Sequence, residues 1–569
     1  MGARFWGSAG LAVAGLITAA TLLPGSYGGE PLLAPFLADP TPPLAEATPT
    51  EPSTGTSPEG LPLPATTVRR DAEADARVRS SDDALRSRIE RTLPTTRFPG
   101  SEWAVLAVSL QHGDTLFARN ADLPLAPASN MKVLTSAAAL HYLGSDFRFP
   151  TYVITEGAVQ DGVLTGDLVL YGTGDPALSD RFHSRRTEAL EALAQELRNQ
   201  GIHRIEGDVV GDGSFFQEAG VPGSWDPNNF NNAYSAPVSA LSFNENVVTL
   251  RVGPGLVPGT PARVQTIPEE VDLPIVNDAT TVDGPPGRPL IVDRGRFEDS
   301  IQISGNLRVG APEAWRVIPV GDPTAFAASV FRNVLFEEGI VVSGRSRGLR
   351  DDTEGGTTEP HLWAPRFRSE VQAPRVLAVH RSPPLLDLLE VVNKRSNNLY
   401  AELIFLALGQ AVLADGTFDG GRATVQRFLE RVVGLDVSEI QIEDGSGLSR
   451  ENRVSARHLV AVLDFMETSP HGEAFWSTLP EAGNPRELRR MYQTAAAGNL
   501  RAKTGTIRRA SALSGIVQTR SGEPVLFSII GNEVPSPWAF KRIEDEIGAE
   551  LAGFRRSSPP VGMPLPAPR

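Results

Sequence analysis

The segment that decides the fold is Pro127-Ala128-Ser129-Asn130-Met131-Lys132, which continues into an apolar run from Val133 to Leu140. The run predicts a buried helix, and Gly144 predicts where that helix ends. Ser129 and Lys132 lie three positions apart, so they share one helix face and their polar groups can meet. A desolvated lysine can take the proton of a serine hydroxyl and make it a nucleophile. The spacing therefore predicts acyl-transfer chemistry without histidine, although a capped helix end with a solvated lysine is the alternative for an isolated match.

The composition limits the class of protein. With 569 residues the chain is too long for one core, so we expect two or more domains. A net charge of −15 without any cluster of Lys and Arg argues against a nucleic-acid partner. The absence of cysteine excludes thiol nucleophiles, thiolate zinc sites and disulfides.

The two ends of the chain predict an exported protein. Residues 1–27 carry a single charge, Arg4, before an apolar run of small residues, which is typical of a signal peptide or a membrane anchor. Residues 28–70 are rich in Pro, Thr and Ser and predict a disordered linker, as residues 557–569 predict a disordered tail. We therefore expect the periplasm or another extracytoplasmic cell-wall compartment, with membrane association if the first segment is retained.

The middle of the chain predicts a domain split by an insert. A strand hairpin at residues 103–118 precedes Ser129, within a first domain part at residues 71–152. Over residues 153–374, strand-like runs alternate with Gly, Pro and Asp turns, and we expect one or more inserted domains there. The first domain then resumes at residues 375–556.

A second candidate motif is Ser396-Asn397-Asn398, which lies in a corner between two apolar helical patterns. Here a second hydroxyl could relay a proton, and an amide could hold a substrate carbonyl or amide group. An ordinary turn with Asn caps is the alternative.

A third candidate motif is Lys503-Thr504-Gly505-Thr506, on the first strand of a predicted antiparallel meander that extends to Ile530. Glycine lets a ligand backbone approach an edge strand closely, and the lysine and hydroxyls suit an anionic carboxylate. A surface strand with a solvated lysine is the alternative. An amphipathic helix at about residues 539–551 follows the meander.

These three motifs, in this order, resemble the set used by penicillin-binding proteins and serine β-lactamases. Between Lys132 and Ser396 lie 263 residues, whereas 104 lie between Asn398 and Lys503. This spacing resembles the class C low-molecular-mass penicillin-binding proteins, the D-alanyl-D-alanine carboxypeptidase/endopeptidases, as does the stretch Asp444-Gly445-Ser446-Gly447-Leu448-Ser449-Arg450. The resemblance implies an α/β (α+β) fold, in which a β-lactamase-like transpeptidase domain has an antiparallel sheet flanked by helices and a large insert between the first two motifs.

The resemblance also implies a role for each motif residue. Ser129 would attack the carbonyl between two D-alanines, with Lys132 as base. Ser396 would relay the proton to the leaving amine, and Asn398 would bind the substrate amide and orient the lysine. The terminal carboxylate would be held by the third motif: Lys503, Thr504, Gly505 and Thr506. The backbone N–H groups of Ser129 and Thr506 would form the oxyanion hole.

Two further positions follow from the resemblance. Asp212 and Arg450 match residues that contact the diamino-acid side chain of the stem peptide in relatives. Their opposite charges would suit an ammonium and a carboxylate on one zwitterionic side chain. Arg508 stands where some relatives carry a neutral residue, so the preferred diamino acid stays open.

The function implied is a serine DD-peptidase that hydrolyses D-alanyl-D-alanine bonds of peptidoglycan stem peptides through an acyl-enzyme on Ser129. Cross-bridge cleavage is open too, because both activities break a bond to a D-configured residue. β-Lactam antibiotics would be covalent inhibitors, and no metal or organic cofactor is implied. The alternatives are a non-catalytic module that binds wall peptides and a β-lactamase, which the long insert disfavours.

Overall fold

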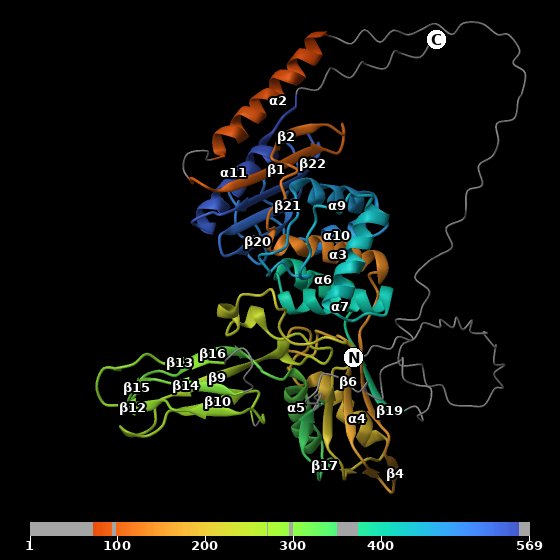
Figure 1. The fold of residues 1–569 in the computed structure, drawn as a ribbon, viewed down its shortest axis with the longest axis vertical. Coiled ribbons are helices and arrows are strands. Elements are labelled where there is room, and N and C mark those ends of the chain that lie inside the picture. The colour runs from red at the N-terminus through yellow and green to blue at the C-terminus, as the bar shows by residue number, and fades with distance from the viewer. Residues whose placement is uncertain (1–71, 94–97, 270, 295–299, 350–373, 557–569) are drawn as a thin grey trace, which may run out of the picture.

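A computed structural model describes residues 72–93, 98–269, 271–294, 300–349 and 374–556. The predicted signal or anchor segment, the predicted linker and the predicted tail lie outside the described residues. The described chain forms an upper body, which carries both ends of the described chain, and a lower body formed by the insert (Figure 1).

A five-stranded antiparallel sheet organises the upper body, in the order β2-β1-β22-β21-β20. Its strands are β1 (Glu102–Ser109), β2 (Thr115–Arg119), β20 (Arg501–Ile507), β21 (Ala510–Gln518) and β22 (Pro524–Asn532). Successive side chains of β1 enter different cores, because Trp103 and Val105 belong to one apolar cluster and Ala104 and Leu106 to another. Both faces of the sheet are therefore covered, which explains its nearly continuous apolar strands.

Helices cover the two faces of this sheet (Figure 1). The pair α2 (Ala72–Thr92) and α11 (Pro537–Gly553) packs on one face. The other face meets a helical layer, which comprises α3 (Met131–Tyr142), α6 (Leu385–Lys394), α7 (Asn398–Leu413), α8 (Phe418–Arg427), the π-helix η6 (Phe428–Val433), α9 (Ala456–Thr468) and α10 (Gly472–Thr478). The predicted catalytic helix lies in this layer as α3, and Gly144 follows it with a φ of 81°.

The insert contains two larger sheets, in the orders β18-β8-β6-β3-β19 and β17-β7-β5-β4. The strands of the first are β3 (Pro150–Thr155), β6 (Leu168–Gly172), β8 (Val209–Asp212), β18 (Ser346–Gly348) and β19 (Arg375–Arg381). Those of the second are β4 (Ala158–Gln160), β5 (Val163–Thr165), β7 (Arg204–Ile205) and β17 (Val341–Val342). Helices α4 (Glu188–Asn199) and α5 (Pro323–Glu337) pack on them in a shared apolar core.

Small strands form an arm that projects sideways from the insert (Figure 1). They are β9 (Val247–Gly253), β10 (Arg263–Ile267), β11 (Ile275–Asn277), β12 (Thr280–Val282), β13 (Ile291–Asp293), β14 (Ile301–Ser304), β15 (Asn306–Arg308) and β16 (Ala314–Pro319). They pair in three small sheets: β10-β9-β16, β11-β14-β13 and β12-β15.

The insert begins and ends on a shared strand pair. β3 and β19 are antiparallel neighbours, so the chain enters and leaves the insert side by side. The sequence-based boundary at residue 153 falls inside β3, and the boundary at residue 374 directly precedes β19. Hydrogen bonds between strands that are far apart in the chain decide this boundary, and local composition does not reveal them.

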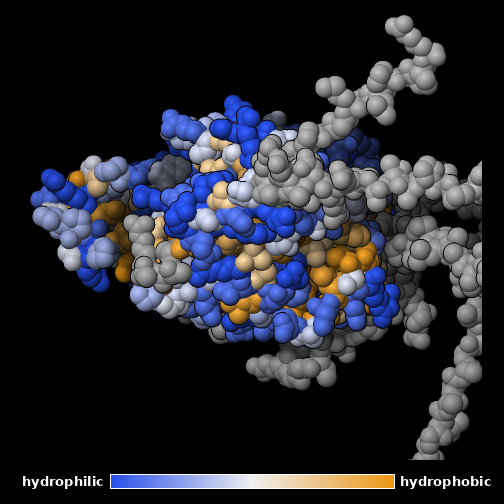
Figure 2. Space-filling view, turned by 90° about the horizontal axis from the view of Figure 1, so that it is seen from above, coloured by the Kyte–Doolittle hydropathy of each residue, from blue (hydrophilic) through white to orange (hydrophobic). Residues whose placement is uncertain are grey.

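The face shown in Figure 2 is mainly hydrophilic, with several apolar patches among the polar residues. Within the described ranges, no single helix has the length and apolar character needed to cross a membrane. One bent pair, α7 with α8 and η6, passes by length and composition alone, with a bend of 72°.

Candidate active site

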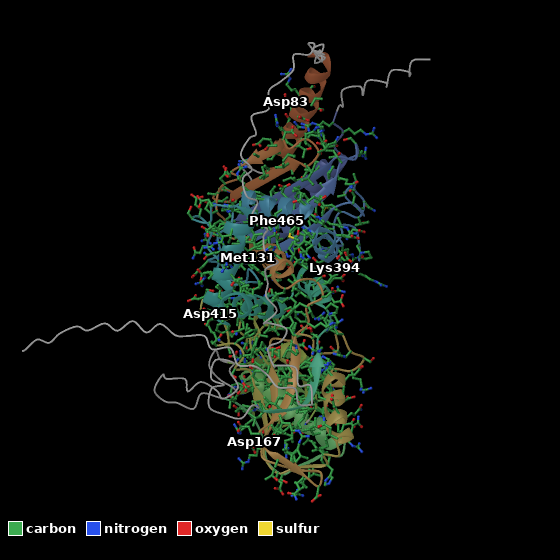
Figure 3. All side chains as sticks on the ribbon, turned by 90° about the vertical axis from the view of Figure 1, so that its right-hand side faces the viewer. Asp83, Met131, Asp167, Lys394, Asp415 and Phe465 are labelled. Atoms are coloured by element: carbon green, nitrogen blue, oxygen red, sulfur yellow. The ribbon has the colours of Figure 1, made fainter. Side chains whose placement is uncertain are left out.

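Three segments meet at the boundary between the sheet and the helical layer: the start of α3, the corner between α6 and α7, and β20. Met131, which follows the first motif serine by two positions, lies inside the upper body, whereas Asp167 marks the insert below it (Figure 3). The Lys132 ammonium donates to Ser129 Oγ (3.2 Å) and to Asn398 Oδ1 (2.7 Å). Its third hydrogen bond goes to the Ser446 carbonyl (2.7 Å), so all three N–H donors of this buried lysine have acceptors.

The second motif lies in the corner that the sequence predicts. Helix α6 ends at Lys394, and Asn397 caps α7 by accepting from the Tyr400 N–H group. Between the helices Ser396 adopts a φ of 55°, a left-handed conformation that costs a non-glycine residue about 1–2 kcal/mol. This strained turn directs Ser396 Oγ towards β20, where it accepts a hydrogen bond from Lys503 Nζ (2.9 Å).

The third motif packs directly on the Ser129 turn. A Cβ atom at Gly505 would stand 2.9 Å from the Pro127 oxygen and 3.1 Å from the Ser129 nitrogen, so only glycine allows this approach. The Asn130 amide ties the two segments together by donating to the Lys503 carbonyl (2.9 Å) in the orientation that satisfies its partners. The close approach brings the backbone N–H of Ser129 next to the strand that carries Thr506.

Burial lowers the pKa of both lysines of the site. Desolvation lowers the pKa of Lys132 to about 7, against the opposing attraction of Glu402 and Asp444. Burial also holds the pKa of Lys503 well below its usual range, and repulsion from Lys132 adds to this effect. Near neutral pH, Lys132 can therefore be a free amine beside the Ser129 hydroxyl, as a general base requires.

The insert contributes to the site from its loops. The Tyr234 carbonyl accepts a hydrogen bond from Asn398 Nδ2 (2.8 Å), which turns the amide oxygen towards Lys132. Trp225 Nε1 donates to the buried Asp444 carboxylate (2.9 Å), in the loop that supplies the lysine's third acceptor. The insert thus holds two neighbours of Lys132 in place.

The two predicted side-chain ligands differ in their surroundings. Asp212 is fully buried at the end of β8, where its carboxylate accepts from the Ser214 N–H group (2.8 Å). Arg450 lies at the surface of the upper body, held by the Arg508 carbonyl (2.5 Å) and by Glu533 (3.0 Å). The contact of Asp212 and Arg450 with a diamino-acid side chain stays a prediction.

A different aspartate of the insert faces the arginines. The pKa of Asp226 is lowered, first by hydrogen bonds from the backbone and side chain of Asn228 and then by the positive charges of Arg508 and Arg450. Asp226 is partly exposed, so this aspartate and the two arginines border solvent. No motif in the sequence indicates Asp226, because only the fold places its loop beside the upper body.

Another residue that the motifs do not contain is Glu402, on α7 one turn after Asn398. Its side chain is fully buried, and both carboxylate oxygens accept backbone N–H groups of the loop that passes over Lys132. The signal in the sequence is a lone acidic residue inside the apolar helix 398–413. No group of three or more His, Asp or Glu residues in the described part of the chain could hold a metal ion.

The fold and the meeting of the three motifs define a serine acyl-transfer enzyme of the penicillin-binding class. The candidate nucleophile Ser129 has a lysine within hydrogen-bond distance, and a second serine accepts a hydrogen bond from a second lysine. Over residues 85–552 the sequence matches the D-Ala-D-Ala carboxypeptidase 3 (S13) family, and the chain belongs to this family. It is a serine-type D-Ala-D-Ala carboxypeptidase, so the predicted enzyme class is confirmed. The family assignment does not favour either alternative, the non-catalytic binding module or the β-lactamase.

Individual relatives agree with this assignment. The chain is 33% identical over 492 residues to the D-alanyl-D-alanine carboxypeptidase of Actinomadura sp. (strain R39), which covers 84% of this chain and 86% of that relative. Penicillin binding protein 4 (dacB) of Haemophilus influenzae has a similar structure, with a TM-score of 0.68 and 25% identity over 82% of this chain and 99% of that one. A second structure of that protein, in complex with a β-lactam, has a TM-score of 0.63 and 24% identity over the same shares. The predicted fold class is confirmed.

Proposed function

We propose that this carboxypeptidase acts on peptidoglycan stem peptides and releases their terminal D-alanine through an acyl-enzyme on Ser129. The observation that carries the proposal is the buried Lys132, whose ammonium group lies 3.2 Å from Ser129 Oγ and whose pKa is lowered to about 7. A lysine in this state can take the hydroxyl proton while the oxygen attacks a carbonyl carbon.

The first half of the reaction forms the acyl-enzyme. Lys132 takes the proton of Ser129 as its oxygen bonds to the carbonyl carbon between the two D-alanines. The backbone N–H groups of Ser129 and Thr506 stabilise the resulting oxyanion. Ser396, hydrogen-bonded to Lys503, passes its proton to the amine as the C–N bond breaks and D-alanine leaves. The proton that Lys132 took from Ser129 then passes to Ser396, so Lys132 is again a free amine.

The second half hydrolyses the ester. A water molecule gives a proton to the Lys132 amine and attacks the acyl carbon, and Ser129 recovers its hydrogen as the C–O bond breaks. The Asn398 amide holds the substrate backbone and keeps its oxygen on Lys132. Lys503, with Thr504 and Thr506 on either side of Gly505, binds the terminal carboxylate, whose negative charge favours the ammonium form of this buried lysine.

We place the side chain of the stem-peptide diamino acid between the insert and the upper body. Asp226 offers a carboxylate to an ammonium group, and Arg450 and Arg508 offer guanidinium groups to a carboxylate. The support is the electrostatic proximity of these three residues, which border solvent near the Tyr234 loop. Exchange of Asp226 for Asn is expected to weaken binding of peptides with a free side-chain amine. Equal KM values for peptides whose side-chain carboxylate is amidated and for peptides whose side-chain carboxylate is free would contradict the placement.

The same serine is expected to bind β-lactams, as the family and the β-lactam complex of the Haemophilus influenzae relative support. A lasting penicilloyl adduct should map to the peptide that contains Ser129. Hydrolysis of a D-Ala-D-Ala peptide should vanish in Ser129→Ala, and assays on monomeric and cross-linked muropeptides will separate carboxypeptidase from endopeptidase activity. A folded wild-type protein that neither binds penicillin nor releases D-alanine would refute the proposed function.

We propose an extracytoplasmic location for this activity. The support is chemical: the substrate lies outside the cytoplasmic membrane, and residues 1–27 have the composition of a signal peptide or anchor. Fractionation of cells that express the full chain should find it outside the cytoplasm, and deletion of residues 1–27 should retain it inside. Extraction of the full chain by salt or only by detergent distinguishes a cleaved signal from a membrane anchor.

A further inference from the structure

A buried acid lies behind the catalytic lysine and belongs to none of the three motifs. Glu402 stands four residues after Asn398 on α7, so the two side chains share one face of the helix. Its Oε2 accepts the Gly445 N–H (2.9 Å) and its Oε1 accepts the Ser446 N–H (2.9 Å). Both oxygens are thus occupied by donors, an arrangement that favours the ionised carboxylate.

The loop that Glu402 holds also holds the lysine. The Ser446 carbonyl accepts the Lys132 ammonium at 2.7 Å, and the N–H group of the same residue donates to Glu402. The backbone of one residue therefore connects the glutamate to the base. A movement of Glu402 would move the carbonyl that fixes where Lys132 points, and the contact to Ser129 Oγ depends on that direction.

Two acidic and two basic side chains are buried around the active site. Asp444, on the same loop, accepts hydrogen bonds from Trp225 Nε1 (2.9 Å), Asn452 Nδ2 (2.9 Å) and the N–H groups of Gly447 (2.7 Å) and Ser449 (2.6 Å). Lys503 is a second buried lysine, on β20, and burial together with repulsion from Lys132 lowers its pKa. Two buried acids thus lie close to two buried lysines, and removal of either acid removes attraction that favours the ammonium forms.

The energetic effects on Lys132 run in opposite directions. Burial lowers its pKa, whereas Glu402 first and Asp444 second raise it. Burial and Asp444 raise the pKa of Glu402, against hydrogen bonds from Ser446 and Gly445 and the attraction of Lys132. The glutamate and the lysine therefore titrate as a pair, and the charge of one affects the proton affinity of the other.

We propose that Glu402 is a positioning residue for the acyl-transfer reaction: it holds the Ser446 carbonyl on Lys132, and its negative charge stabilises the ammonium form of that lysine. This inference rests on the proposed function, in which Lys132 is the base. Because the free amine is the reactive form, Glu402 sets the lower edge of the pH range in which the enzyme works.

The experiment is the pH profile of acylation in Glu402→Gln. The variant has nearly the same shape and no charge, so the ammonium form of Lys132 loses stabilisation. We expect the acidic limb of the second-order acylation rate with a chromogenic β-lactam to move roughly one unit to lower pH. The maximal acylation rate, reached above the acidic limb, should also fall, because the single oxygen of an amide side chain replaces the two carboxylate oxygens that accept the Gly445 and Ser446 N–H groups. An acidic limb that is unmoved, or that moves to higher pH, would overturn the inference.

Two variants serve as controls. Glu523→Gln removes another buried carboxylate, which pairs with Arg556 (3.1 Å) at the turn before β22, and its pH profile should match the wild type. Glu402→Asp keeps the negative charge on a shorter side chain. Its maximal acylation rate should therefore fall, while the acidic limb of its pH profile stays in place. This variant also tests the inference if the Gln variant fails to fold, because a displaced limb in a folded Asp variant would contradict the role of charge.

The outcome separates this inference from the proposed function. If the proposed function fails, the wild type neither hydrolyses a D-Ala-D-Ala peptide nor forms a penicilloyl adduct. If only the role of Glu402 fails, the wild type is active and its acidic limb coincides with that of Glu402→Gln.

Discussion

Replacing Gly505 by Ala tests whether the close approach of β20 to the nucleophile creates the oxyanion hole. A Cβ atom there would lie 2.9 Å from the Pro127 oxygen and 3.1 Å from both Ala128 Cβ and Ser129 N. Ordinary contacts of these atom types begin at about 3.4 Å, so the strand and the Ser129 turn must separate by roughly half an ångström.

The size of the expected effect follows from hydrogen-bond geometry. Oxyanion donors act at about 2.7–3.1 Å, and half an ångström more takes the Ser129 or Thr506 N–H out of effective range. Loss of one such donor costs about 2.7–4 kcal/mol of transition-state stabilisation, or roughly a 100-fold to 1,000-fold lower rate. We therefore expect Gly505→Ala to fold and to lose at least about 100-fold in acylation rate.

The assay is the stopped-flow acylation rate with a chromogenic β-lactam, together with the thermal midpoint of each variant. Gly553→Ala is the matched control, because a Cβ atom at that position meets nothing within 4 Å. It should acylate as the wild type does. A folded Gly505→Ala enzyme that acylates at the wild-type rate would refute the reasoning, because the strand would then have room that the structure denies.

Three further predictions follow from buried groups. The wild-type acylation rate should rise with pH and reach half its maximum near pH 7, because burial lowers the pKa of Lys132 to about 7 and the free amine is the base; a half-maximum near pH 10 would contradict this role. Trp225→Phe removes a hydrogen bond to the buried Asp444 carboxylate and should cost about 1.5–3 kcal/mol, seen as a lower thermal midpoint. Trp476→Phe is its control, because the Nε1 of Trp476 is buried without a partner; equal midpoints would show that the Trp225 bond adds nothing. Burial raises the pKa of Asp175 to about 7, so its contribution to stability is fully present below pH 3.8 and is lost as pH rises through about 7. Asp175→Asn should therefore gain up to roughly 4 kcal/mol over the wild type at pH 8 and little at pH 4, measured by denaturant unfolding, and a constant difference would contradict the assignment.

Much of the site could be predicted because each motif is local. The spacing of Ser129 and Lys132 needs only helix geometry to bring the two side chains together. The corner that holds Ser396 follows from the ends of two apolar helical patterns, and the strand that holds Lys503 follows from its meander. Each of these depends on residues a few positions apart, where hydrophobic periodicity is informative.

The assignments that the sequence left open and those it did not suggest share a physical cause. Asp212 and Asp226 are both acidic residues of loop-rich segments, and only the packing of the insert buries one and turns the other towards Arg450. Glu402 could have been noticed as a lone acid in an apolar helix, but its partners lie more than 40 positions further along the chain. The edges of the insert depend on the pairing of β3 with β19, which are also distant in sequence.

The sequence by itself determined which groups are candidates for the chemistry, because residue type and short spacing indicate a nucleophile, a base and a carboxylate ligand wherever the local helix or strand forms. Tertiary structure alone decided their environment: the desolvation that lowers the pKa of Lys132, the strain at Ser396, and the insert loops that orient Asn398 and Asp444. The physical reason is that burial, charge balance and hydrogen-bond direction are properties of groups that meet only when distant segments pack together.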